Sequence, residues 1–149
     1  MDGKNPDQLL VRRFMQAPNA PLPIDTNPVA ADLAMVLQKW DPTARSLTVG
    51  FTASQRHMQG NGTVHGGVIS TMLDLALVFP ILGALEPPKV AVTVSLNLHF
   101  EKPVLPGDLI AVARIDQLGG RLAFATAELR RGEGGGVLAR ATAAMAVLG

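Results

Sequence analysis

A glycine-rich segment that runs into a long apolar stretch holds the residues best suited to chemistry. Residues 59–67 read QGNGTVHGG, and the apolar stretch follows at once. At a helix start the first backbone N–H groups lack partners within the helix, and the positive end of the helix dipole lies behind them. A carbonyl oxygen placed against Gly66 or Gly67 would be polarised there, as in an oxyanion hole. Phosphate binding is the commoner use of such loops, so the glycine pair alone indicates little.

Asp74 is the only charged side chain between His65 and Glu86, and it lies within the apolar stretch. On a helix, Ser70 and Thr71 stand one turn earlier, so their hydroxyl groups share its side. A buried carboxylate needs partners, water or a function, and desolvation favours its protonated form. We therefore expect Asp74 to act as a general base near neutral pH, with a hydrogen-bonded structural carboxylate as the alternative.

The histidines and the lack of cysteine narrow the chemistry further. The chain has no Cys, which excludes disulfides, a Cys nucleophile and thiolate metal ligands. His57 and His99 show no metal-ligand spacing with His65 or Asp74, so we expect no metal site. Taken alone, His65 is more often a helix-start or packing residue than a catalyst.

Composition and charge describe a small chain without a strongly charged partner. Its 149 residues are typical of a single domain, and 13 Lys and Arg against 12 Asp and Glu leave a net charge of +1. This balance disfavours nucleic acids and anionic membranes as partners. The most apolar stretch, 66–85, contains Asp74, which would cost about 3 kcal/mol in a bilayer. The N-terminus lacks the features of a secretory signal, so we expect a soluble, cytoplasmic protein.

The elements expected before the apolar stretch are short. Helical spacing predicts a helix over 6–17, and four prolines predict an irregular connection over 18–28. Asn27 and Pro28 predict the start of another helix. The residues that follow fit both a helical stripe and an alternating strand. We favour a short helix followed by a hairpin, whose second strand covers 46–52.

The apolar stretch and the chain after it predict the core of the fold. A helix is expected over 68–79, enclosed on all sides, with a kink or an early end at Pro80. Alternation and glycine turns then predict four long strands joined as an antiparallel meander, at 90–100, 109–118, 121–131 and 137–148. The fold class is therefore α+β, with an antiparallel sheet wrapped around a central buried helix.

The loop, the helix carboxylate and the strand that follows also resemble a known family. His65-Gly66-Gly67, Asp74 nine residues after the histidine, the strand sequence TVSLNLHF and a Pro-Gly-Asp turn together resemble the hotdog-fold acyl-CoA thioesterases. The similarity is greatest to the phenylacetate-pathway and hydroxybenzoyl-CoA thioesterase branch. It covers about residues 28–148, so we expect an N-terminal helix and connection at 1–27 and a thioesterase domain at 28–149.

The resemblance implies a role for each residue near the helix start. A backbone N–H of Gly66 or Gly67 would polarise the thioester carbonyl, and Asp74 would act as general base or nucleophile. Gln59, six residues before the histidine, would hold the attacking water or the thioester. Asn61 is its rival if the loop register slips.

The resemblance implies further contacts around these groups. His65 would shape the loop and contact the substrate or its partner loop, and Thr93 on the strand would place the water. From its position on the Asp74 side of the helix, we also expect Ser70 to contact the substrate. Some relatives use a Thr one helical turn after the carboxylate, where this chain has Val78. Four basic side chains are candidates for contact with the CoA phosphates: Lys102, Arg121, Arg130 and Arg131.

The resemblance also implies a substrate and an assembly. In the family two subunits pair edge to edge, and each site takes the loop from one chain and the carboxylate from the other. We therefore expect a homodimer or homotetramer that hydrolyses acyl-CoA to free acid and CoA. The substrate brings its own coenzyme A, and no other cofactor is expected.

Two other functions fit the same residues. A hydratase or dehydratase of acyl thioesters on the same fold would pair His65 with Asp74. A non-catalytic acyl-CoA-binding domain would keep the pocket, although such a binder has little use for a buried carboxylate. Release of free thiol would distinguish a hydrolase from both.

Overall fold

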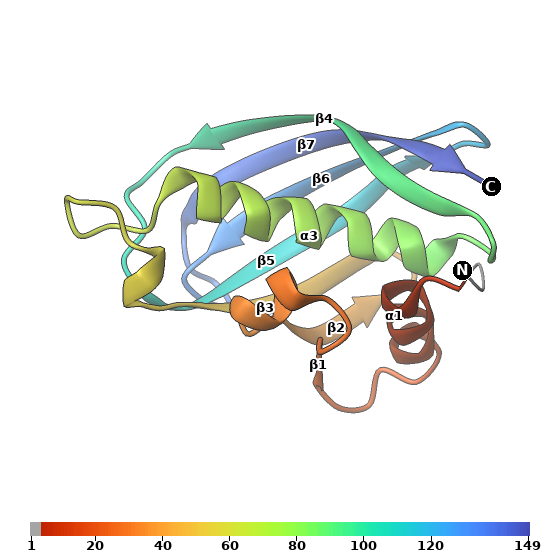
Figure 1. Cartoon of the computed structure of the whole chain (residues 1–149), viewed down its shortest axis with the longest axis horizontal. Helices are drawn as coiled ribbons and strands as arrows, with labels where there is room; N and C mark the ends of the chain where they lie inside the picture. The colour runs from red at the N-terminus through yellow and green to blue at the C-terminus, as the bar shows by residue number, and fades with distance from the viewer. Residues whose placement is uncertain (1–3) are drawn as a thin grey trace.

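A strongly curved antiparallel sheet wraps around one long helix (Figure 1). The structure is a computed structural model, and it describes residues 4–149. The strands follow the order β1-β2-β3-β5-β6-β7-β4, and every neighbouring pair is antiparallel. The elements are α1 (Pro6–Gln16), β1 (Leu22–Pro23), α2 (Pro28–Asp32), β2 (Val36–Asp41), β3 (Ser46–Ala53), η1 (Gln55–His57), α3 (Gly66–Ala84), β4 (Val90–Phe100), β5 (Gly107–Leu118), β6 (Leu122–Arg130) and β7 (Val137–Leu148). The predicted α+β fold with a central helix is confirmed.

The central helix α3 forms because most of its surface is apolar and is covered by other parts of the chain. It packs against β3, β4, β5, β6, β7 and α1. Met72, Leu73, Leu77 and Phe79 are among its fully buried side chains. By length and composition α3 could also cross a membrane, but in this fold it is the core helix.

The early end expected at Pro80 does not occur, so that part of the prediction is wrong, while the alternative, a kink at Pro80, stays a prediction. The helix continues to Ala84, and the Leu85 N–H still donates to the Ile81 carbonyl at 3.1 Å. Pro80 is buried, as are the residues on either side of it. Burial of this apolar surface outweighs the one backbone hydrogen bond that a proline removes.

Two side chains of α1 cap the C-terminal end of α3. Gln8 is 1% exposed, and its Nε2 donates to three main-chain carbonyl groups. These belong to Leu82, Leu85 and Lys89, at 3.2, 3.1 and 2.8 Å. Arg12 donates to the Leu85 carbonyl at 2.5 Å. Because the last carbonyls of a helix lack partners within it, α1 supplies the donors that this end needs.

The last four strands are not the simple meander that we predicted. β5, β6 and β7 are neighbours in both sequence and space, but β4 pairs with β7, and β5 pairs with β3. The chain leaves α3, forms one edge of the sheet as β4, and returns through 101–106 to the middle of the sheet. Alternation identifies a strand but not its neighbour, so this crossover could not be predicted from it.

The proline-rich connection after α1 is not entirely irregular, which corrects our prediction for 18–28. Leu22 and Pro23 form the short strand β1, which pairs with Leu37 and Val36 of β2. Proline is tolerated here because β1 is an edge strand and needs no donor on its outer side. The short helix α2 and the β2–β3 hairpin are as predicted.

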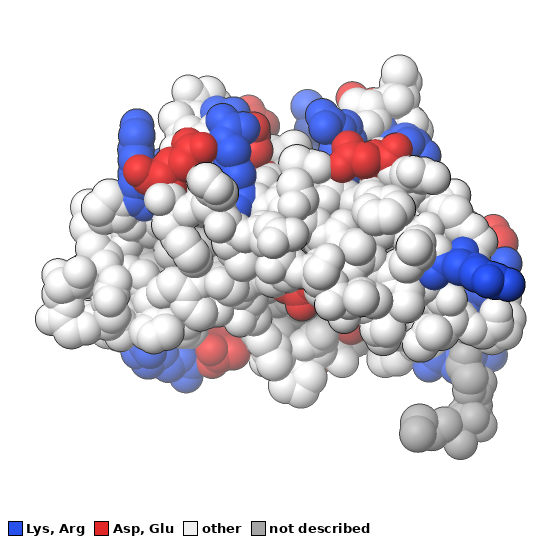
Figure 2. Space-filling view, turned by 90° about the horizontal axis from the view of Figure 1, so that it is seen from above, with Lys and Arg blue, Asp and Glu red and all other residues white. Residues whose placement is uncertain are grey.

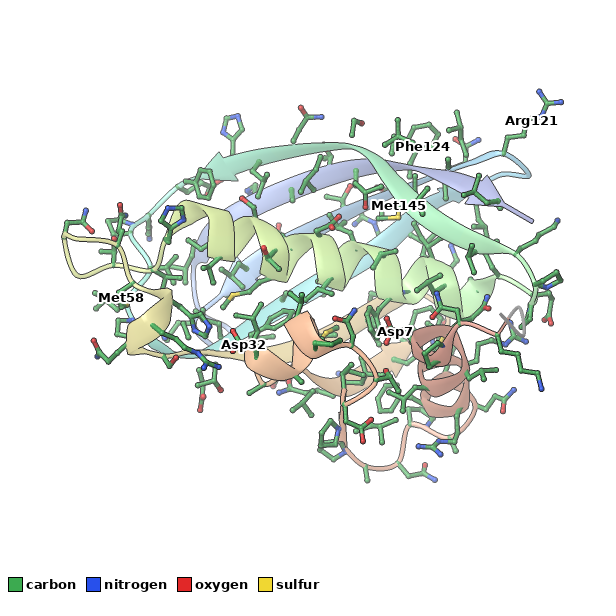
Figure 3. The ribbon with its side chains drawn as sticks, in the orientation of Figure 1. Asp7, Asp32, Met58, Arg121, Phe124 and Met145 are labelled. Atoms are coloured by element: carbon green, nitrogen blue, oxygen red, sulfur yellow. The ribbon has the colours of Figure 1, made fainter. Side chains whose placement is uncertain are left out.

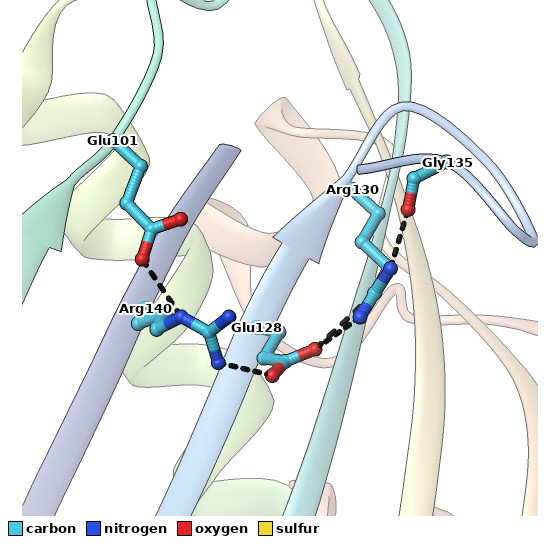
Figure 4. A network of polar contacts seen from close by, with 5 residues as sticks. All are labelled: Glu101, Glu128, Arg130, Gly135 and Arg140. Atoms are coloured by element: carbon cyan, nitrogen blue, oxygen red, sulfur yellow. Dashed lines mark hydrogen bonds and ion pairs between the residues drawn. The ribbon is translucent and has the colours of Figure 1, made fainter. Parts of the chain in front are cut away.

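A network of charged side chains ties three strands together on the outer face of the sheet (Figure 4). Arg140 of β7 pairs with Glu101, just after β4, at 2.7 Å, and with Glu128 of β6 at 2.5 Å. Arg130 pairs with Glu128 at 2.6 Å and also donates to the Gly135 carbonyl. The hydrogen bond from Arg130 holds the pKa of Glu128 below its ordinary value.

Candidate active site

The start of α3 has one free backbone donor. His65 is the N-cap, and its Nδ1 accepts a hydrogen bond from the Gly67 N–H at 2.9 Å. The N–H groups of Val68 and Ile69 donate to the His65 carbonyl. Across residues 4–149, by contrast, no acceptor pairs with the Gly66 N–H. Of the two predicted oxyanion donors, Gly66 is therefore the one that a ligand can use.

Asp74 and Thr93 form a polar pair between α3 and the edge strand β4. Thr93 Oγ1 donates to Asp74 Oδ1 at 2.7 Å, so the structure brings these two predicted residues together. Asp74 is half-buried rather than enclosed as the apolar sequence predicted, because this face of α3 is not fully covered by its own chain. Val78, one turn later, is also half-buried and adds no polar group. The second oxygen of Asp74, Oδ2, has no hydrogen-bond partner among residues 4–149 and can accept from water or substrate.

The hydroxyl groups one turn before Asp74 donate within the helix. Ser70 Oγ donates to the Gly66 carbonyl at 2.7 Å, and Thr71 Oγ1 donates to the Gly67 carbonyl at 2.9 Å. Neither hydroxyl donates to Asp74. Substrate contact by Ser70 stays a prediction, and it would use the lone pairs of an oxygen whose proton is already engaged.

A surface cavity of about 380 Å³ opens beside Gly66. Gln59 and Asn61 of the glycine-rich loop contribute to its wall, as do Phe100 and Lys102. The Phe100 ring lies 3.6 Å from the position that a Cβ on Gly66 would take. Sequence reasoning missed Phe100, although it ends the alternating run of β4. The wall of the cavity therefore contains the free backbone donor, an aromatic side chain, one cation and the carboxylate of Glu101.

The side-chain amides of Asn61 and Gln59 differ in which of their polar atoms lack a hydrogen-bond partner among residues 4–149. Asn61 Oδ1 accepts from the N–H and the hydroxyl of Thr63, at 3.2 and 2.7 Å, and so stabilises the turn. Gln59 donates through Nε2 to Thr63 Oγ1 at 2.9 Å, while its Oε1 has no partner among residues 4–149. Gln59 is thus better placed than Asn61 to hold water or substrate, and its role stays a prediction.

The basic candidates lie in different places. Lys102 lines the cavity beside the helix start. Arg130 and Arg131 are bonded to a glutamate and to main-chain carbonyls of their own chain. Arg121 lies in the β5–β6 turn, at the end of the molecule opposite to Met58 and the glycine-rich loop (Figure 3). A single chain therefore does not bring Arg121 to this cavity.

The free donor and the carboxylate are too far apart to act on one carbonyl group within a single chain. Gly66 and Asp74 are eight residues apart on α3, and this spacing is a rise of about 12 Å. A reacting carbonyl group needs the oxyanion donor and the base, or its water, each about 3 Å away. One chain therefore presents two half-sites, the Gly66 half-site and the Asp74 half-site. Among residues 4–149 no group of three His, Asp or Glu side chains could hold a metal ion.

The strand that carries Thr93 is an unpaired edge of the sheet. β4 pairs with β7 on one side and with no strand of residues 4–149 on the other. Val92 and Val94 on it are 47% and 64% exposed. In the view onto this edge, charged side chains gather toward the borders and leave a broad middle almost free of them (Figure 2). A long, apolar, unpaired edge is suited to pairing with another strand.

Known proteins share this sequence pattern and this architecture. Residues 61–138 match the family model of the thioesterase superfamily. A provisionally named esterase from Pseudomonas aeruginosa is 41% identical over 90 residues, which are 60% of this chain and 67% of that protein. A provisionally named thioesterase from Ralstonia eutropha JMP134, related to phenylacetic acid degradation, superposes with a TM-score of 0.78 at 28% identity, over 92% of this chain and 98% of that one. A Bacillus halodurans protein solved with CoA superposes with a TM-score of 0.64 at 29% identity, over 68% of this chain and 66% of that one.

The family match covers the residues around which the two half-sites are built. Residues 61–138 make up more than half of the chain and include Gly66, Asp74 and Thr93. The sheet wrapped around α3 is the hotdog fold that the resemblance predicted, and that recognition is confirmed. This chain therefore belongs to the thioesterase superfamily.

Proposed function

We propose that this protein hydrolyses acyl-CoA thioesters to the free acid and CoA, with Asp74 and the Gly66 N–H as the reacting groups. One observation carries the proposal: Thr93 holds Asp74 at 2.7 Å on an open face of α3, and the start of the same helix leaves the Gly66 N–H free. Membership of the thioesterase superfamily supports thioester hydrolysis in general. The CoA in the Bacillus halodurans relative supports CoA as the leaving group.

Asp74 can act in either of two ways. As a general base, its carboxylate takes a proton from water while the hydroxide oxygen bonds to the thioester carbon. The C–S bond then breaks, and the thiolate of CoA takes up the proton. As a nucleophile, the carboxylate bonds to the carbon and expels the thiolate, and water then hydrolyses the mixed anhydride. In both routes Thr93 orients the carboxylate through Oδ1 and leaves Oδ2 for the reaction.

The Gly66 N–H stabilises the negative charge that develops on the carbonyl oxygen. A single donor of this kind contributes about 3 kcal/mol to the transition state of a protease. The positive end of the α3 dipole adds to the effect. Gln59, with a free Oε1 in the wall of the same cavity, holds the attacking water or the thioester.

We assign the two half-sites of one active site to different chains of a homodimer. The separation of about 12 Å along α3 prevents one chain from completing the site. Pairing of β4 with β4 of a second copy would cover Val92 and Val94 and extend the sheet. The same pairing would cover the half-buried face of α3 that carries Asp74 and bring the Gly66 half-site of the second copy toward it.

Lys102 is the basic side chain best placed to meet a CoA phosphate from within the cavity. The Phe100 ring beside Gly66 offers an apolar surface next to the reacting carbonyl. We therefore expect the thioester to pass this cavity with its acyl group near Phe100 and its charged end near Lys102.

A panel of aryl, short-chain and medium-chain acyl-CoA thioesters tests the function. We expect at least one class to release free thiol, measured with a thiol reagent. A change in enoyl-CoA absorbance without release of thiol would instead indicate a hydratase. Binding of the thioesters without any turnover would indicate a non-catalytic binder, and either result would overturn the proposal.

A further inference from the structure

His57 is a buried, titratable residue that the proposed reaction does not use. It is 5% exposed and lies at the end of the short helix η1. Its Nδ1 accepts a hydrogen bond from the Ser54 N–H at 2.9 Å, and its Nε2 lies 2.9 Å from Asp32 Oδ2. Because Nδ1 accepts, the ring proton is on Nε2 and is donated to Asp32. His57 therefore joins α2 to the segment that leads into α3.

The local sequence explains why a histidine fits this position. Ser54 and His57 are three residues apart and form a capping box, in which the side chain at the third position accepts from the N-cap N–H. Glu and Gln are the residues usually found at that third position. Histidine fills the same role through Nδ1. Its second nitrogen, Nε2, adds a hydrogen bond to Asp32, which lies outside the short helix.

The backbone of His57 also holds the cap of α3. Its carbonyl accepts the His65 N–H at 2.8 Å. His65 in turn accepts the Gly67 N–H at 2.9 Å, which leaves Gly66 as the free donor. A short chain of hydrogen bonds thus leads from Asp32 to the start of α3. Through these bonds the position of His57 constrains that of His65, which lies directly before the Gly66 N–H.

We propose that His57, held by Asp32 and Ser54, is a positioning residue that aims the Gly66 N–H at the thioester carbonyl. The inference rests on the proposed function, since it concerns how the same site is held in place. His57 touches neither substrate nor the reacting atoms and acts through His65. A shift of about 1 Å in a catalytic group can cost about 100-fold in rate, so a residue that fixes the loop can control turnover.

A second function for the cluster, as a serine nucleophile with its base, is not supported by the contacts. Ser54 Oγ lies 3.2 Å from His57 Nδ1, as a nucleophile would. The lone pair of Nδ1 already accepts the Ser54 N–H, so it is not available to take the hydroxyl proton. The cluster is therefore suited to holding the loop and not to attacking a carbonyl carbon.

Protonation of His57 would break this arrangement. A proton on Nδ1 would face the Ser54 N–H, and two donors would then meet at 2.9 Å. The charged groups that face the ring are Asp32 of α2 and Arg56 of η1, which is itself paired with Asp32. Burial first, and then the charge of Arg56, hold the pKa of His57 below its ordinary value of 6.5. The neutral form is thereby kept at neutral pH.

Three variants test the positioning role through the kinetics of thiol release. We expect His57→Leu to lower kcat by about 10- to 100-fold and to leave KM nearly unchanged, because the reacting groups remain but are misaligned. His57→Gln should restore most of kcat, since a carboxamide offers an acceptor for Ser54 and a donor for Asp32. Gln8→Leu removes a buried polar side chain at the far end of α3 and should lower Tm without lowering kcat.

The role is overturned if His57→Leu lowers kcat no more than Gln8→Leu does at a matched loss of Tm. It is also overturned if His57→Gln, once shown to be folded, fails to restore kcat. A pH profile gives a further check. In wild type, part of the fall in kcat at acid pH should coincide with the protonation of His57. That part should be missing in His57→Gln.

An NMR titration separates this inference from the proposed function. In wild type the amide signals of Gly66 and Gly67 should include a transition with the same midpoint as the signals of the His57 ring, and that transition should be missing in His57→Gln. If this coupling is seen but the protein releases no thiol, the missing release overturns the proposed hydrolysis. The coupling still supports the link from His57 to Gly66. If thiol release is normal but the amide shifts of Gly66 and Gly67 do not follow the titration of His57, the positioning role is overturned. The proposed function is then unaffected.

Discussion

Gly66 contributes a main-chain N–H, which any residue except proline can provide. It is the first residue of α3, where proline is tolerated, and His65 already has a conformation that suits the residue before a proline, with φ −61° and ψ 135°. Gly66→Pro therefore removes the donor and keeps the helix. We expect kcat for thiol release to fall by about 100- to 1,000-fold.

The matched control for this change is Gly66→Ala, which keeps the N–H. Its Cβ would lie 3.6 Å from Phe100, an ordinary van der Waals contact. Gly66→Ala should therefore retain most of the turnover. Equal losses in the two variants would show that side-chain bulk, and not the missing donor, causes the effect.

Asp74 contributes the carboxylate, and its removal can be made nearly isosteric. Asp74→Asn keeps an oxygen that accepts from Thr93 but cannot take a proton from water. We expect thiol release to fall by at least about 100-fold, with Tm close to that of wild type. Turnover near the wild-type rate in a folded Asp74→Asn variant would remove Asp74 from the mechanism.

The residue types of the site could be read from the sequence, but their exact partners could not. Asp74 stands out because it is the only charge in a long apolar run. The choice between Gly66 and Gly67 depends on the His65 side chain, which bonds Gly67 alone. Phe100 and Arg121 lie in unrelated parts of the sequence, so only the fold shows that Phe100 is near Gly66 and Arg121 is remote.

At the scale of the elements, the strands and helices follow from local pattern, and their pairing does not. Alternation and glycine turns locate β4 to β7, and proline and Asn caps locate α1 and α2. The continuation of α3 through Pro80 depends on burial and on the donors that Gln8 supplies from α1. The β4–β7 pairing depends on how the whole sheet wraps around α3, and local sequence patterns do not contain that information.

The charge network on β6 and β7 predicts a loss of stability in acid. A carboxyl with a lowered native pKa stabilises the fold above its unfolded-state pKa, and that stabilisation is lost as the pH falls through the native pKa. For Glu128 the ordinary value is 4.5. Wild type should therefore exceed Glu128→Gln in free energy of unfolding by about 1 kcal/mol at pH 7.

That difference should shrink as the pH falls from the ordinary pKa of the carboxyl through its lowered native pKa, where Glu128 of the folded protein becomes protonated. Urea unfolding of both proteins at neutral and acid pH measures it. A difference that is the same at both pH values would show that the ion pairs with Arg130 and Arg140 do not stabilise the sheet.

At the scale of the whole molecule, two features lead us to expect a dimer: the exposed edge of β4, and the separation of the Gly66 half-site from the Asp74 half-site. Val94 is 64% exposed and lies at the irregularity between Thr93 and Ser95. A lysine on an edge strand opposes pairing with another strand. Val94→Lys should therefore be monomeric by light scattering and should lose thiol release, although it leaves every reacting group in place.

Val29→Lys is the matched control for this change. Val29 is a comparably exposed valine, at 52%, on α2 rather than on the edge strand. This variant should stay assembled and active. A monomeric Val94→Lys protein with full turnover would show that a single chain completes the site.

The most direct test of the account is thiol release by a mixture of two inactive proteins. Asp74→Asn keeps the Gly66 donor, and Gly66→Pro keeps the Asp74 carboxylate, so a mixed dimer contains one site in which both groups are intact. After unfolding and refolding together in equal amounts, half of the dimers are mixed, and the mixture should recover about a quarter of wild-type turnover. A mixture that forms mixed dimers and yet stays as inactive as its two components would contradict the account.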